Sequence, residues 1–116
     1  MESNTSFSEY IDIDDALARI GGNIALYKRL LGRFLEGKHL EDIKNAIESG
    51  DLEEAARQSH TLKGVSANLS LLIINKLTIE LEHLIKDGAD FSACLSELEE
   101  AYENTTVKIT ELSEQP

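Results

Sequence analysis

His60 is the residue of this 116-residue chain whose type and setting could do chemistry. It opens the run His60-Thr61-Leu62-Lys63-Gly64, within the longest helical pattern of the sequence. A glycine inside a helix costs about 1 kcal/mol relative to alanine. Because helical side chains lean toward the N-terminus, any side chain at position 64 would lean over the imidazole one turn earlier. The pattern therefore indicates that something large must reach His60.

Cations and small residues surround His60 on its face of the helix. Arg57 and Lys63 lie three residues to either side of His60. The small side chains of Ala56 and Ala67 leave further open space around the ring. Neighbouring cations disfavour imidazolium, which keeps the ring neutral and nucleophilic, and they would stabilise an incoming anion. A phosphoryl group on the ring would find Lys63 within reach. An ordinary surface histidine remains the alternative interpretation.

Other chemistries lack the residues they need. A metal site needs several ligands, and the three histidines and one cysteine are widely spread. There is no G-x-x-x-x-G-K-[ST] loop for a nucleotide, and a convex helical face offers no cleft for a catalytic triad. We therefore expect no metal, no bound cofactor and no enzymatic activity of the chain by itself. An exposed histidine can carry a group for partners that bring the catalytic machinery.

Composition excludes several classes of partner. With 11 basic and 22 acidic residues the net charge is −11, which argues against binding to nucleic acid or to an anionic membrane surface. The longest uncharged run, Gly64 to Asn75, is far shorter than the roughly 20 residues that span a bilayer. Cys94 is the only cysteine, which fits a reducing compartment. We expect a cytoplasmic protein without direct membrane contact.

The apolar spacing predicts an all-α fold, an antiparallel four-helix bundle with one or two short extra N-terminal helices. The bundle is expected over residues 12–112, between a flexible lead-in over 1–11 and a tail over 113–116. Caps, glycine stops and apolar spacing predict helices over about 13–20, 24–36, 40–49, 52–69, 74–87 and 91–112.

The central helix is expected to hold His60 outside the core. Its core-facing seam repeats with 3-4 spacing and consists of Leu52, Ala55, Ser59, Leu62, Ser66 and Leu69. Half of these residues are small, so neighbouring helices can approach closely. On a wheel of 100° per residue, His60 lies roughly 130° from this seam. A buried core histidine is therefore disfavoured.

The run from His60 to Gly64, followed by small residues and Leu69, resembles the histidine-containing phosphotransfer (HPt) domain of multistep phosphorelays. The family pattern is His-x-Leu-Lys-Gly with Leu-Gly at the end of the helix. The segments 18–23, 50–51 and 81–82 also look like family features, so that the resemblance covers about residues 12–112. Ser70 departs from the pattern, because the family usually has glycine there, and we expect it to cap the next helix.

The resemblance implies a phosphocarrier. His60 would accept a phosphoryl group from the aspartyl phosphate of a receiver domain and pass it to the aspartate of another receiver, which supplies Mg²⁺, carboxylates and a lysine. Nε2 is the expected reacting atom. Glu82 would orient the ring by accepting from Nδ1–H, although a solvated acid on a helix face is the alternative for this residue.

The docking face is expected around His60, and it comprises Arg57, Thr61, Lys63, Gly64, Val65, Ala67 and Asn68. Val65 is expected to project outward as a hydrophobic contact, with packing at the helix edge as the alternative. Arg57 could equally form a surface salt bridge, and Asn68 could simply stabilise the helix end. His39, His83 and Cys94 are expected to be structural.

The expected partners are response-regulator receiver domains and a histidine or hybrid kinase, bound by a monomer. Two other functions stay open. The chain could be the phosphoacceptor domain of a chemotaxis-type histidine kinase, phosphorylated by an ATP-binding domain. It could also be a non-catalytic helical interaction module in which His60 is incidental.

Overall fold

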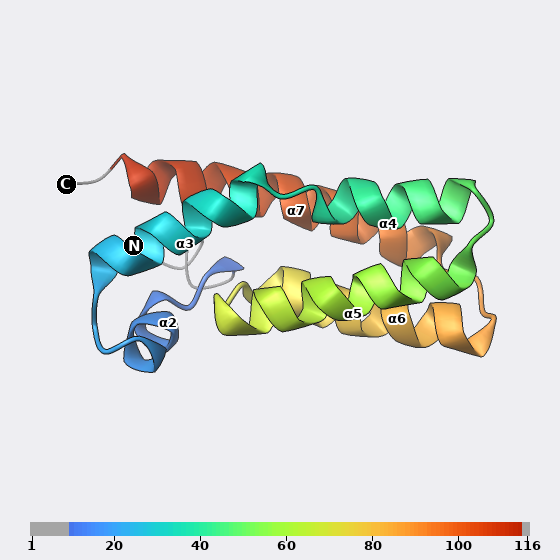
Figure 1. Cartoon of the computed structure of the whole chain (residues 1–116), viewed down its shortest axis with the longest axis horizontal. Helices are drawn as coiled ribbons and strands as arrows, with labels where there is room; N and C mark the ends of the chain where they lie inside the picture. Colours follow the sequence, from blue (N-terminus) through green and yellow to red (C-terminus); the bar gives the residue numbers. More distant parts are fainter. Residues whose placement is uncertain (1–9, 115–116) are drawn as a thin grey trace.

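The computed structural model describes residues 10–114, and helices dominate this part of the chain (Figure 1). They are α2 (Ile13–Arg19), α3 (Ile24–Glu36), α4 (His39–Glu48), α5 (Leu52–Asn68), α6 (Leu72–Asp87) and α7 (Ser92–Ser113). The predicted all-α bundle is confirmed.

Side-chain caps and glycines set most helix boundaries within two residues of the predicted ones. Asp12, Asn23 and Asp51 each accept a hydrogen bond from the backbone N–H three residues later, at the starts of α2, α3 and α5. These bonds satisfy N–H groups that have no partner within a helix. At the other end of α6, Gly88 adopts a left-handed conformation with φ 70°, which costs glycine little.

The long helix α7 spans the bundle. Its 22 residues correspond to about 33 Å, and α3 and α4 follow one another along it on one side (Figure 1). An ion pair of 2.7 Å between Lys44 and Glu99 ties α4 to α7. Helices α5 and α6 form an antiparallel pair joined by a short turn, in which α5 packs against α4 and α6 packs against α7 (Figure 1). The helix that carries His60 is therefore held between α4 and α6.

Small residues let α5 pack closely against its neighbours. Ala55, Ser59, Leu62 and Ser66 are fully buried, as the seam predicts, and the Ser59 hydroxyl donates to the Ala55 carbonyl within the helix. The expected burial of Leu52 was wrong, because it lies in the first turn and stays 42 % exposed. This exposed leucine lines the same groove as His60.

The chain packs against the bundle before the expected boundary at residue 12. Ile11 is buried and forms an isolated antiparallel bridge with Leu71, and the Tyr10 hydroxyl accepts from Asn104 on α7. Assigning these two residues to a flexible lead-in was therefore wrong. The rest of the expected lead-in, residues 1–9, and residues 115–116 of the expected tail lie outside the described residues.

Ser70 occupies the turn between α5 and α6 with a left-handed φ of 56°, a conformation that glycine adopts at lower cost. Its expected role as a cap was wrong, because Leu71 takes the N-cap position of α6. The Ser70 hydroxyl instead donates to the Asp15 carboxylate at 2.7 Å, and its carbonyl accepts from Asp12 N–H. Serine at this position thus anchors α2 to the end of the His60 helix.

Candidate functional site

The helix α5 presents His60 on its outer face. The side chain is 66 % exposed, although the seam residues on the opposite face of the same helix are buried. Exposure and a rigid helical support are both needed if a partner is to reach a ring in a defined position.

A single carboxylate organises the surroundings of His60. Glu82 projects from α6 and is only 6 % exposed. Its Oε2 lies 3.1 Å from His60 Nδ1 and 2.9 Å from Lys86 Nζ, and its Oε1 lies 3.0 Å from Lys63 Nζ. A buried carboxylate is tolerated because these donors compensate for its lost hydration.

The pKa of Glu82 reflects this setting. Burial raises it, but hydrogen bonds from Lys86, Lys63 and His60 outweigh burial and lower the pKa of Glu82 to about 2. The carboxylate is therefore ionised at neutral pH and acts only as an acceptor.

An ionised Glu82 fixes the tautomer of His60. Because Oε2 can only accept, the facing Nδ1 must carry the proton. In a neutral ring the lone pair then resides on Nε2, and no side chain among residues 10–114 is bonded to that nitrogen. The arrangement offers one free, oriented nucleophilic nitrogen to the solvent.

Gly64 leaves open space one turn beyond His60. Apart from the backbone of its own helix, a Cβ built at this position meets no atom of residues 10–114 within 4 Å, and the backbone is helical rather than left-handed. Among the described residues, neither packing nor backbone conformation therefore requires glycine here. The open space beside the ring is available to a partner that approaches His60.

The remaining residues of the expected docking face divide into two groups. Thr61, Ala67 and Asn68 are exposed, and Arg57 is 65 % exposed and paired with Glu54. The outward projection expected for Val65 was wrong, because it is half-buried and packs against the core. It lies 140° around the helix from His60, where it lines a second surface hollow together with Leu30 and Arg33 of α3.

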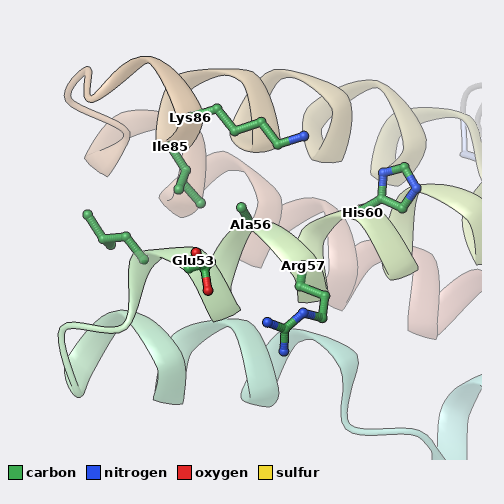
Figure 2. A pocket seen from close by; sticks show the side chains of 7 residues that line it. Glu53, Ala56, Arg57, His60, Ile85 and Lys86 are labelled. Atoms are coloured by element: carbon green, nitrogen blue, oxygen red, sulfur yellow. The ribbon is translucent and has the colours of Figure 1, made fainter.

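Lys86 is the residue of the site that the sequence did not reveal. It lines a groove between the first half of α5 and the end of α6, together with Leu52, Glu53, Ala56, Arg57, His60 and Ile85 (Figure 2). Its position four residues after Glu82 is the usual spacing of a helical ion pair. That spacing becomes informative only once Glu82 is known to face His60.

The other reactive side chains have structural environments. His39 stacks on Phe34 with ring centroids 5.6 Å apart. His83 pairs with Asp87 on the exposed side of α6. The Cys94 thiol is buried, and burial raises its pKa to about 11, which makes it a poor nucleophile.

Residues 10–114 contain no group of three or more His, Cys, Asp or Glu side chains placed to hold a metal ion. None of their helices combines the length and the apolar character needed to cross a bilayer.

The fold and the site define a helical bundle that holds an oriented, accessible histidine on the outer face of α5. The chain belongs to the Hpt domain family, because the family model for the Hpt domain matches residues 29–111. Members of this family are phosphocarriers in two-component signalling, where they interact with receiver domains and histidine kinases. Comparison with curated proteins and with solved structures gave no significant match.

Replacing Glu82 by glutamine should lower the free energy of unfolding at pH 7 by about 2 to 3 kcal/mol. The lowered pKa of Glu82 means that its stabilisation is fully present above about pH 5 and is lost as the pH falls toward 2. Urea unfolding of wild type and Glu82→Gln between pH 7 and pH 2.5 should therefore show a difference that shrinks with acidification. A difference that stays constant over this range would contradict the assigned ion pairs.

Proposed function

We propose that His60 is the phosphoacceptor and that the chain carries a phosphoryl group between receiver domains of a phosphorelay. The observation that supports this most strongly is the asymmetry of the ring. Nδ1 faces the buried Glu82 carboxylate at 3.1 Å, while the side chain as a whole is 66 % exposed. Family membership supports phosphotransfer, and this asymmetry supports His60 Nε2 as the place where it happens.

The transfer needs no catalytic group from this chain beyond the ring and its supports. Nε2 attacks the phosphorus of a receiver aspartyl phosphate, and the bond from phosphorus to the aspartyl oxygen breaks, returning its electron pair to the carboxylate. The ring becomes a phosphoimidazolium with a proton on Nδ1, whose charge the adjacent Glu82 stabilises. Mg²⁺ held by the receiver would neutralise the moving phosphoryl oxygens.

Lys63 supports the phosphorylated state in this proposal. In the present structure its ammonium is paired with Glu82 Oε1, and the side chain is 34 % exposed. A phosphoryl dianion on Nε2 would compete with Glu82 for this cation, because charge-assisted bonds to phosphate are strong. Lys63 could then hold the phosphoryl group from the side of the ring that faces α6.

The proposed docking face surrounds the ring on α5. Arg57, Thr61, Ala67 and Asn68 present an exposed surface there with a cation at one end, and Gly64 leaves room for close approach. A receiver's phosphorylation pocket is acidic, so the cation contributes electrostatic complementarity.

The site would equally serve a histidine phosphorylated by a kinase's ATP-binding domain, as in a chemotaxis-type kinase. The phosphoryl donor distinguishes these two functions. A phosphorelay carrier takes its phosphoryl group from a phosphorylated receiver, and a kinase's phosphoacceptor domain takes it from the ATP-binding domain. A pure interaction module would bind a receiver with unchanged affinity when His60 is replaced, and it would gain no phosphate.

His60→Gln should abolish phosphate uptake from a phosphorylated receiver, while wild type gains an acid-labile, alkali-stable phosphate. His83→Gln is the matched control, because His83 is an exposed histidine that lies on α6 and pairs with Asp87 instead of Glu82. Transfer of ³²P in the presence of Mg²⁺ measures the outcome. Uptake by His60→Gln, or none by wild type across a panel of receivers, would overturn the proposal.

Gly64→Gln should slow transfer at least about tenfold, since displacing the reacting atoms by about 1 Å can cost more than that. The fold should persist and gain up to about 1 kcal/mol of stability, because glutamine favours helix over glycine and its Cβ would meet no atom of the described neighbours within 4 Å. Gly32→Gln is the matched control, a helical glycine on α3 with equally open surroundings. Full transfer activity of Gly64→Gln would refute the proposal that Gly64 leaves room for a receiver to reach His60.

A further inference from the structure

Lys86 and His60 compete for the same oxygen atom. Both Nζ of Lys86 and Nδ1 of His60 bind Oε2 of Glu82, at 2.9 Å and 3.1 Å, whereas Lys63 binds the other oxygen. Figure 2 shows the Lys86 side chain extending along α6 with its ammonium directed toward the His60 end of the groove. Sharing one oxygen places the ammonium at most about 6 Å from Nδ1.

The proton on Nδ1 controls how easily a phosphoryl group leaves Nε2. When the Nε2–P bond breaks, its electron pair returns to Nε2. If Nδ1 is protonated, the leaving group is a neutral imidazole, and if it is not, the leaving group is an imidazolate anion, which leaves far less readily. The acceptor, an aspartate carboxylate or water, forms the new P–O bond in either case. Any group that weakens the hold of Glu82 on this proton therefore makes the phosphohistidine last longer.

We propose that Lys86 is a positioning residue that slows loss of the phosphoryl group, because it shares Oε2 of Glu82 and so limits how strongly that carboxylate holds a proton on Nδ1. This inference rests on the proposed function of His60, and it assigns to Lys86 a role in setting the lifetime of the phosphorylated state.

Two electrostatic effects of Lys86 act in the same direction. Its ammonium draws electron density from Oε2, and its positive charge repels the imidazolium form of the ring. The side chain is 62 % exposed, so its charge acts on the ring through a water-like dielectric and the effect is modest.

The charged groups near the ring among the described residues lie on α5 and α6, the two helices that form the site. Glu82 and Lys86 face it from α6, and Glu53, Arg57 and Lys63 come from α5. Helix α4, which also packs against α5, lines no part of the groove. Lys86 is the most suitable of these to replace, because its own side chain is 62 % exposed and Glu82 keeps its contacts with His60 and Lys63 when Lys86 is removed.

The test compares Lys86→Met with wild type after chemical phosphorylation of His60 by phosphoramidate. The rate of phosphohistidine hydrolysis is measured from pH 5 to pH 9. Hydrolysis at pH 8 should be about threefold to tenfold faster in the variant, because Glu82 then holds the proton on Nδ1 more strongly. Lys86→Arg keeps the charge and should restore a profile close to wild type.

Lys76→Met is the matched control, since it removes an exposed lysine from the same helix that forms no ion pair with any described residue. Its profile should coincide with that of wild type. Identical profiles of Lys86→Met and wild type would overturn the inference, and so would a Lys86→Arg protein that hydrolyses as fast as Lys86→Met.

Titration of the unphosphorylated His60 ring by NMR separates failure of this inference from failure of the proposed function. The ring should titrate at higher pH in Lys86→Met than in wild type, whether or not a phosphoryl group can be attached. An unchanged titration would refute the competition for Oε2. A shifted titration in a protein that forms no phosphohistidine would instead reject His60 as the phosphoacceptor.

Discussion

The buried carboxylate of Glu82 is the constraint on which the site depends. An ion removed from water is tolerated only when donors surround it, and here His60 and Lys63 from α5 and Lys86 from α6 provide them. These contacts require one face of α5 to meet one face of α6 in a single register. The small residues Ala55, Ser59 and Ser66 of the α5 seam allow that close approach.

Core and reactive surface occupy opposite sides of α5, which lets one helix satisfy two conflicting demands. The buried side keeps the helix straight and fixed between α4 and α6. The outer side can then keep an exposed imidazole and a glycine that contributes no packing, although that glycine costs about 1 kcal/mol of helix propensity. The contact with Glu82 orders the ring despite its exposure.

Local patterns predicted most of the fold, whereas features set by tertiary contacts escaped them. Helix caps at Asp12, Asn23 and Asp51 and the seam of α5 depend on short-range spacing, which the sequence displays directly. Periodicity also placed His60 outside the core. The sharing of Glu82 with Lys86 depends on how α6 is rotated against α5, and the left-handed Ser70 depends on its bond to Asp15. Spacing along one helix contains neither piece of information.

The most direct test of the central claim is to identify which nitrogen of His60 carries the phosphorus. Two-dimensional ¹H–¹⁵N NMR of the phosphorylated, ¹⁵N-labelled protein distinguishes the two ring nitrogens by their couplings to the carbon-bound ring protons. Because Glu82 occupies Nδ1 and leaves Nε2 free, the structure predicts phosphorus on Nε2 and a proton on Nδ1. Phosphorus on Nδ1 would contradict the arrangement of Glu82, Lys63 and Lys86 as the device that orients the ring.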